Sequence, residues 1–162
     1  MTSGRGGAAA TAVTAAVART ALIRASRDRV WAVLTDFASM HQWFVGVRGV
    51  RLDGPPRAGT HRLVTFAGGL MQRETISVWA PPAHLALAVE ETSGLVAEGT
   101  NVDIRLSAAA DGLRLEWSID YRLNLGRFAA LLTRPFVRAL VGAALGVSLA
   151  RMRKLAEASP LS

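Results

Sequence analysis

Cysteine is absent from this chain of 162 residues, so disulfides, thiolate metal ligands and thiol nucleophiles are excluded. The three histidines, His41, His61 and His84, are far apart in the sequence. In the absence of cysteine, three dispersed histidines do not predict a metal site. The chain also has no glycine-rich phosphate loop and no motif that pairs a nucleophile with a base. We therefore expect no metal and no cofactor.

The length corresponds to one domain with a core of its own. Apolar residues make up 51% of the chain, which is too many for a disordered protein. Residues 1–11 are small and contain no leucine-rich run, so we expect a disordered leader and not a secretory signal. We expect a single domain at residues 12–158, a tail at 159–162 and a cytoplasmic location.

Acidic residues are scarce near the C-terminus. The formal net charge is +7, and from Asn124 onward six basic residues are accompanied by one acid, Glu157. The preferred interpretation is a solvated helix face, and the alternative is a surface that binds an anionic membrane or an acidic partner. Nucleic acid is not expected as a partner, because aromatic residues do not alternate with these arginines.

Hydrophobic periodicity predicts an α+β chain in which a strand is followed at once by two short helices. Six more strands and one long helix then follow, with turn signals such as Asp53-Gly54-Pro55-Pro56 between the strands. The predicted strands span residues 14–23, 45–52, 60–66, 70–79, 85–91, 101–106 and 113–123, and the predicted helices span 27–35, 38–44 and 135–157.

The first predicted helix has a well-defined beginning and end. Ser26 is placed to cap its first turn, and Asp28 puts a negative charge near the positive end of the helix. Trp31 lies on its apolar face, where we expect it in the core. Asp36 ends this helix and is placed to cap the second one.

The last helix is predicted to begin at Pro135, because a proline in the first turn loses no hydrogen bond. Residues 127–133 form either a helical turn or a loop. Residues 136–150 are strongly apolar but too short and interrupted for a convincing membrane span, so we expect a helix that the sheet nearly buries. Gly142 and Gly146 either leave space beside the helix or allow close packing on the sheet.

The most specific sequence signals are separated along the chain. They are Ile23–Ser26 with Val30–Phe37, Trp43, Val47–Val50, Glu74–Ile76 with Trp79–Pro82, and Leu149–Glu157. Through them, residues 17–157 resemble the START / Bet v 1-like (SRPBCC) superfamily, and within it the polyketide cyclase/dehydrase and lipid-transport group. The resemblance implies the helix-grip fold, a curved antiparallel sheet of about seven strands wrapped around a long C-terminal helix. It also implies a deep cavity between sheet and helix.

Alternation along the strands indicates which side chains face that cavity. Trp117, Ile119 and Tyr121 form the apolar face of their strand, and Gln72 and Glu74 lie on the more apolar face of theirs. The two aromatic residues at the end of the second helix belong either to the core or to the cavity gate. The ligand-binding residues predicted in this way are His41, Trp43, Phe44, Val64, Phe66, Gln72, Ile76, Trp117, Ile119, Phe136 and Leu140.

Three side chains are candidates for chemistry in the cavity: Arg62, Glu74 and Tyr121. A buried carboxylate needs a partner or a raised pKa, and Arg62 lies in phase with the inward residues of its own strand. Together with the Tyr121 phenol, such a pair would orient a ketone or assist enolisation as acid and base. The preferred interpretation is instead an ordinary ion pair between Arg62 and Glu74 on an outer face or at the rim. His61 and His84 begin strands, where we expect them to be exposed.

These observations favour a protein that binds a hydrophobic small molecule, such as a lipid, polyketide or isoprenoid, in the cavity. The first alternative is a polyketide aromatase/cyclase or dehydratase that uses acid–base residues there. The second alternative is a protein that binds a membrane surface or a partner through the basic C-terminal helix. We expect a monomer or a homodimer.

Overall fold

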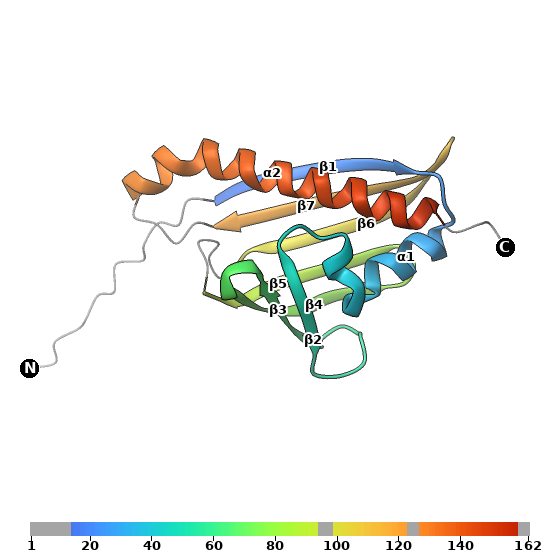
Figure 1. Cartoon of the computed structure of the whole chain (residues 1–162), viewed down its shortest axis with the longest axis horizontal. Coiled ribbons are helices and arrows are strands. Elements are labelled where there is room, and N and C mark those ends of the chain that lie inside the picture. The colour runs from blue at the N-terminus through green and yellow to red at the C-terminus, as the bar shows by residue number, and fades with distance from the viewer. Residues whose placement is uncertain (1–13, 94–98, 123–126, 159–162) are drawn as a thin grey trace, which may run out of the picture.

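One antiparallel sheet of seven strands organises the described part of the chain, in the order β1-β7-β6-β5-β4-β3-β2. The computed structural model describes residues 14–93, 99–122 and 127–158. Its elements are β1 (Thr14–Ile23), α1 (Arg27–Thr35), η1 (Phe37–Gln42), β2 (Val47–Leu52), β3 (His61–Phe66), η2 (Ala67–Gly69), β4 (Met71–Ala80), β5 (His84–Thr92), β6 (Asn101–Ala109), β7 (Gly112–Arg122) and α2 (Arg127–Glu157). The predicted order of elements is confirmed. Figure 1 shows α2 lying along β1 and β7, with α1 near its C-terminal end.

The two short helices after β1 begin with the predicted caps. The Ser26 hydroxyl accepts a hydrogen bond from the Arg29 backbone N–H at 3.2 Å, and an Asp36 carboxylate oxygen accepts one from the Ser39 backbone at 3.3 Å. These caps satisfy N–H groups that have no partner within the helix. Trp31 of α1 is buried and packs edge-on against Trp79, with ring centroids 5.2 Å apart. The prediction that Trp31 belongs to the core is confirmed.

One face of α2 packs closely on the sheet. Leu145, Leu149 and Met152 from this face are buried in the core. A Cβ on Gly142 would lie 2.5 Å from the Arg19 guanidinium, which is the end of a flexible side chain, and 3.7 Å from the Val17 side chain, both on β1. Gly142 therefore lies against the sheet and does not leave open space there. At Gly146 a Cβ would meet nothing within 4 Å.

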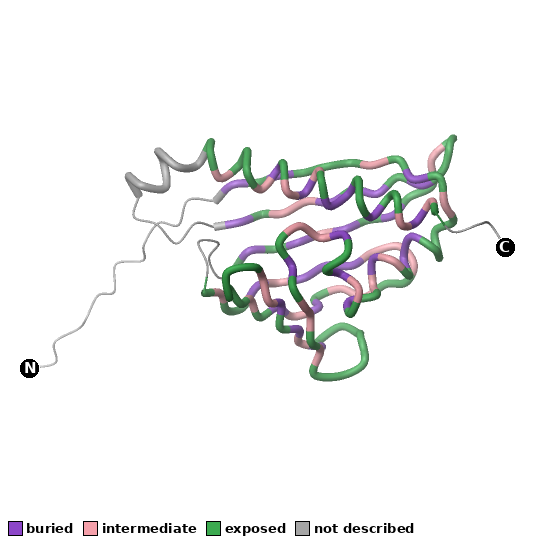
Figure 2. Tube along the Cα trace, viewed as in Figure 1, coloured by how far each residue is buried: buried purple, intermediate pink, exposed green. Residues whose placement is uncertain are grey.

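The structure corrects two predictions about α2. The helix begins at Arg127, so Pro135 lies inside it and not in its first turn. Nor does the sheet nearly bury the helix: only 28% of its most apolar stretch is buried. The physical reason is visible in Figure 1, where α2 lies along β1 and β7 with the sheet on one side only, so the side turned away from the sheet stays uncovered. Figure 2 shows much of the helix as exposed.

The exposed side of α2 carries large apolar side chains. Phe136 is 71% exposed and Leu140 is 60% exposed, so neither faces the interior of the sheet. By length and composition alone, one helix of the described chain, Pro135–Glu157, would suffice to cross a membrane. Its opposite face belongs to the core, through residues such as Met152.

Candidate functional site: a cavity between the sheet and the last helix

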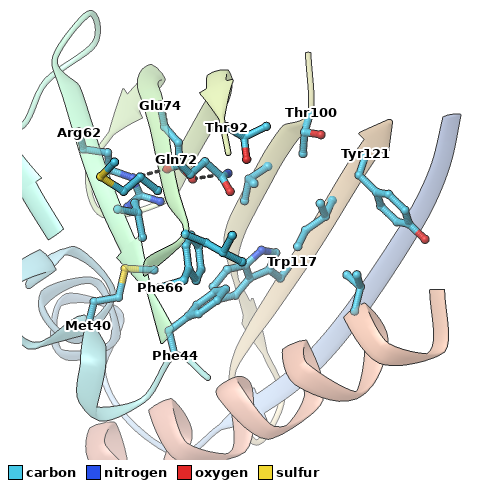
Figure 3. Close-up of a pocket in the computed structure, with 16 residues that line it drawn as sticks. Met40, Phe44, Arg62, Phe66, Gln72, Glu74, Thr92, Thr100, Trp117 and Tyr121 are labelled. Carbon is cyan, nitrogen blue, oxygen red and sulfur yellow. Dashed lines mark hydrogen bonds and ion pairs between the residues drawn. The ribbon is translucent and has the colours of Figure 1, made fainter. Parts of the chain in front are cut away.

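A mainly apolar cavity of about 340 Å³ lies between the concave face of the sheet, η1 and α2. Figure 3 shows its lining side chains converging from these elements. They are Met40, Phe44, Arg62, Val64, Phe66, Leu70, Met71, Gln72, Glu74, Thr92, Thr100, Val102, Trp117, Ile119, Tyr121 and Val141. This combination of apolar walls and a few polar groups is typical of sites for small organic molecules.

One wall of the cavity carries a buried polar cluster of Arg62, Glu74 and Gln72. Arg62 and Glu74 are directly opposite each other on β3 and β4, and each is 4% exposed. Arg62 Nε donates a hydrogen bond to Glu74 Oε2, and Gln72 Nε2 donates one to Glu74 Oε1 at 2.8 Å. The interpretation of an ion pair on an outer face or at the rim is therefore wrong. A buried charge needs a partner, and this pair meets that requirement.

The Arg62 guanidinium also lies over an aromatic ring. Its central carbon is 5.0 Å from the centroid of the Phe37 ring in η1, a favourable cation–π distance. The contact with Glu74 uses Nε, so the terminal amino groups are the donors with which Arg62 would meet a ligand oxygen. Figure 3 shows the side chains of Arg62 and Glu74 at the same end of the cavity.

Tyr121 lies at the other end of the cavity. Its side chain is fully buried on β7, and in Figure 3 its hydroxyl is directed away from Arg62 and Glu74. The structure therefore brings together two of the three candidates for chemistry and separates the third from them. The strand phase allowed all three to face inward, although an outer face or the rim was the preferred position for Arg62 and Glu74; it carries no information on their positions along the cavity.

Phe44 and Trp117 form an aromatic floor of the cavity, and the ring of Trp43 packs behind it. The Trp117 ring lies 5.5 Å from that of Phe44 and 5.9 Å from that of Trp43, measured between centroids, and the contact with Trp43 is edge-to-face. The Nε1–H groups of Trp43 and Trp117 are both buried and have no hydrogen-bond acceptor among the described residues. Trp117 lines the cavity, whereas Trp43 lies behind it in the core.

The predicted ligand-binding residues fall into two groups. Those that line the cavity are Phe44, Val64, Phe66, Gln72, Trp117 and Ile119. Trp43 and Ile76 are instead buried in the core. His41 is exposed, with Nδ1 3.0 Å from the Ala38 carbonyl oxygen on η1. Phe136 and Leu140 do not line the cavity because they lie on the exposed side of α2, whereas Val137 and Val141 of the same turns pack on the core.

Several residues that line the cavity were not predicted from the sequence. They are Met40, Leu70, Met71, Thr92, Thr100, Val102 and Val141. Val102 alternates with buried Ile104 and Leu106 on β6, so the strand phase contained the signal for it. Thr92 and Thr100 flank the connection between β5 and β6, and no local pattern distinguishes them from ordinary turn residues.

Polar clusters on the outer face of the sheet hold both strand-initial histidines. His84 Nε2 lies 2.7 Å from Asp103 Oδ2, and its side chain is 24% exposed, so the expectation of an exposed residue is wrong there. His61 is 37% exposed and lies 3.3 Å from a Glu90 carboxylate oxygen. Burial alone would raise the pKa of Asp103, but hydrogen bonds from Arg105 and His84 outweigh it and hold that pKa below its usual value.

A metal site is not formed by the residues that the structure describes, since none of their His, Asp and Glu side chains gather in groups of three or more suited to an ion. The outer clusters each combine one histidine with one carboxylate and an arginine. We assign these clusters to the stability of the sheet.

Comparison with known families identifies the class of protein. The model of the polyketide cyclase / dehydrase and lipid transport family matches residues 14–157, so the chain belongs to that family. The solved structures that it resembles have the same helix-grip fold. One is the Zhui aromatase/cyclase from Streptomyces sp. R1128, with a TM-score of 0.72 and 18% identity, covering 90% of this chain and 94% of that one.

Two further proteins are similar to this chain, over different shares of their own length. The di-domain aromatase/cyclase BexL from the BE-7585A biosynthetic pathway gives a TM-score of 0.73 at 18% identity, covering 91% of this chain. This chain spans about half of BexL, 51% of its length. An uncharacterized protein of Mycobacterium tuberculosis (strain H37Rv) is 28% identical over 113 residues, 68% of each chain.

Proposed function

We propose that this protein binds a hydrophobic small molecule, of the lipid, polyketide or isoprenoid kind, in the cavity between the sheet and α2. The observation that carries the proposal is the combination of a mainly apolar cavity with a polar cluster, Arg62–Glu74–Gln72, on one wall. Apolar walls supply affinity, and a few fixed polar groups orient the ligand. The volume of about 340 Å³ is near the lower end for such sites, which favours one compact molecule.

Native mass spectrometry of the purified protein tests this proposal. We expect a co-purifying small molecule that organic extraction releases. We also expect the Tm to rise with the concentration of at least one member of a panel of laurate, farnesol and 2-naphthol, because a ligand that binds only the folded state stabilises it. A protein that carries no bound molecule and shows no Tm shift with the whole panel would contradict the proposal.

An aromatase/cyclase activity is the first alternative, and the family and its aromatase/cyclase neighbours support it. In an intramolecular aldol step, a proton moves from an α-carbon to the ketone oxygen as the C–C bond forms, and dehydration then releases water. Arg62 would stabilise the negative charge that develops on that oxygen. Glu74 would position Arg62, since both of its carboxylate oxygens already accept hydrogen bonds.

Turnover of a synthetic poly-β-ketone thioester tests this alternative. We expect Arg62→Met to lower kcat/KM by about a hundredfold or more if Arg62 stabilises the oxyanion. Tyr121→Phe separates the contribution of the phenol, which would act as an acid from the other end of the cavity. Turnover that is unchanged in both variants would remove this chemistry, and binding of the thioester without turnover would leave the binding function.

Membrane binding is the second alternative, and the exposed apolar residues on α2 support it. Phe136 and Leu140 are mostly exposed, and the exposed Arg138 lies between them in the sequence. Apolar side chains beside a cation suit the surface of an anionic bilayer. We expect binding to vesicles that contain phosphatidylglycerol, weakened by salt and by Phe136→Ser. Equal binding to vesicles of phosphatidylcholine alone would count against a role for the charge.

A further inference from the structure

An apolar stripe runs along the side of α2 that is turned away from the sheet. This α2 stripe consists of exposed residues at alternating spacings of four and three, namely Phe136, Leu140, Ala143, Val147 and Ala150. Its three large side chains are 71% exposed at Phe136, 60% at Leu140 and 46% at Val147. Val141 of the same helix lines the cavity, so the α2 stripe lies on the opposite side of α2 and outside the ligand site.

The spacing of the α2 stripe is typical of a seam between two helices. Apolar residues that recur at steps of four and three keep facing one partner helix in a coiled coil. The alanines of the stripe have small side chains, so a second helix can approach α2 closely there. On membrane-insertion scales the large apolar residues carry the favourable free energy. The alternation of large and small residues therefore favours a protein helix over a bilayer surface.

Cations adjoin the α2 stripe and define the charge of its partner. Arg151 and Lys154 are exposed in the next turn of the helix. Glu157, the only acid beyond Asn124, already accepts a hydrogen bond from the Arg153 side chain at 2.9 Å. Arg151 and Lys154 are therefore available to the carboxylates of a partner. A second copy of this chain would bring the same cations to the interface, where like charges repel, so charge favours an acidic partner over self-association.

Beyond the ligand site, we propose that the α2 stripe docks an amphipathic helix of a partner protein, one that carries glutamate or aspartate beside its apolar face. That apolar face packs against Phe136, Leu140 and Val147, and the carboxylates lie near Arg151 and Lys154. Burial of three large apolar side chains supplies the affinity. The charges select the partner and its orientation.

Binding of a fluorescent peptide to the full chain, followed by anisotropy, tests the proposal. The probe is a helical peptide of about three heptads, with leucine at the two seam positions and glutamate at the flanking positions. The control peptide has lysine in place of glutamate. We expect saturable binding of the acidic peptide, which weakens when the NaCl concentration rises from about 0.05 M to about 0.5 M. We expect the lysine peptide to bind at least about tenfold more weakly.

Matched variants locate the docking surface. We expect Leu140→Glu to weaken binding of the acidic peptide at least about tenfold. Leu63→Glu is its control, because Leu63 is a 38% exposed leucine on β3 and should keep the parent affinity. We also expect Lys154→Gln to weaken binding, while Arg48→Gln at an exposed position of β2 does not. Circular dichroism checks folding, and the comparison of the two peptides on the unmodified protein provides the test if a variant fails to fold.

Three results would overturn the proposal. They are equal affinity for the two peptides, parent affinity in a folded Leu140→Glu variant, and no binding of the acidic peptide. In the last case, binding to phosphatidylglycerol vesicles would assign the α2 stripe to a membrane surface, and a dimer in sedimentation velocity that Leu140→Glu dissociates would assign it to a second copy. None of these results changes the binding of a small molecule in the cavity, which the Tm shifts measure separately.

Discussion

Removal of the carboxylate from the buried Arg62–Glu74 pair is expected to destabilise the fold strongly. The two side chains are 4% and 5% exposed, so Glu74→Gln leaves a guanidinium with little access to water. It also weakens the acceptor of the Gln72 amide. Breaking a buried ion pair costs about 3–5 kcal/mol. The Phe37 ring still contacts Arg62 and offsets part of that loss, so we expect a loss near the lower limit, about 3 kcal/mol.

The double variant Arg62→Met/Glu74→Met distinguishes a desolvated pair from two separate polar contacts. Replacing both ions by apolar side chains of similar length removes the unpaired charge, and such exchanges are often neutral. We expect the double variant to lose less stability than Glu74→Gln alone. Urea unfolding followed by circular dichroism measures each free energy, provided that the m-value stays constant.

The exposed pair Arg114–Glu116 is the control for this experiment. Its closest charged atoms are 4.0 Å apart and the side chains are 56% and 53% exposed. We expect Glu116→Gln to change stability by less than about 0.5 kcal/mol. Two results would contradict this expectation. One is a loss of stability in Glu74→Gln no larger than that of the control. The other is a loss in the double variant that equals the sum of the losses in Arg62→Met and Glu74→Met alone.

Three further predictions concern contacts outside the cavity. We expect Gly112→Ala to cost about 3 kcal/mol or more in urea unfolding, because φ is +142° and the new Cβ would lie 2.5 Å from a β1 carbonyl oxygen. We expect Ser148→Ala to cost about 1–3 kcal/mol, because the buried hydroxyl accepts from the Val45 N–H at 3.0 Å. Glu157→Gln should lower the Tm at pH 7 but not at pH 3, because the hydrogen bond from the Arg24 backbone holds the pKa of Glu157 below its usual value.

The sign of the last effect follows from linkage. A carboxyl whose pKa is lowered by folding stabilises the protein above its unfolded pKa, and this contribution is lost as the pH falls through the folded pKa. The effect at pH 7 stays below about 1 kcal/mol because the Glu157 side chain is partly exposed. For the glycine, Gly54→Ala is the control, since a Cβ there meets nothing within 4 Å. Equal losses in both glycine variants, or a Glu157→Gln loss that persists at pH 3, would contradict these predictions.

The strand pattern predicted the strands and about half of the residues that line the cavity, because burial of one face imposes a period of two. The helix-grip fold itself was implied by the family resemblance. The turn at residues 67–69 joins β3 and β4 and sets the register that places Arg62 opposite Glu74. What the pattern cannot decide is whether two charged residues in an inward phase are buried, because isolated charges rarely are. Only the direct pairing across β3 and β4 makes that burial tolerable.

The last helix was predicted less well, for a local and a global reason. Pro135 has the features of a helix start, yet the helix continues for two turns before it. Phe136 and Leu140 are apolar and therefore suggested a buried face, but they lie on the exposed side of α2, while Val137 and Val141 pack on the core. In a helix that is apolar on several sides, periodicity alone does not decide which side the sheet covers.

Two valines of α2 provide the most direct test of the central claim, that the cavity is the ligand site. Val141 lines the cavity, whereas Val147 is 46% exposed on the same helix. Calorimetric titration with 2-naphthol is to be run on Val141→Trp and Val147→Trp, with folding checked by circular dichroism. We expect Val141→Trp to fill the cavity and to weaken binding by at least about tenfold, while Val147→Trp binds like the parent protein. Undiminished binding by a folded Val141→Trp variant would contradict the assignment of the cavity as the ligand site.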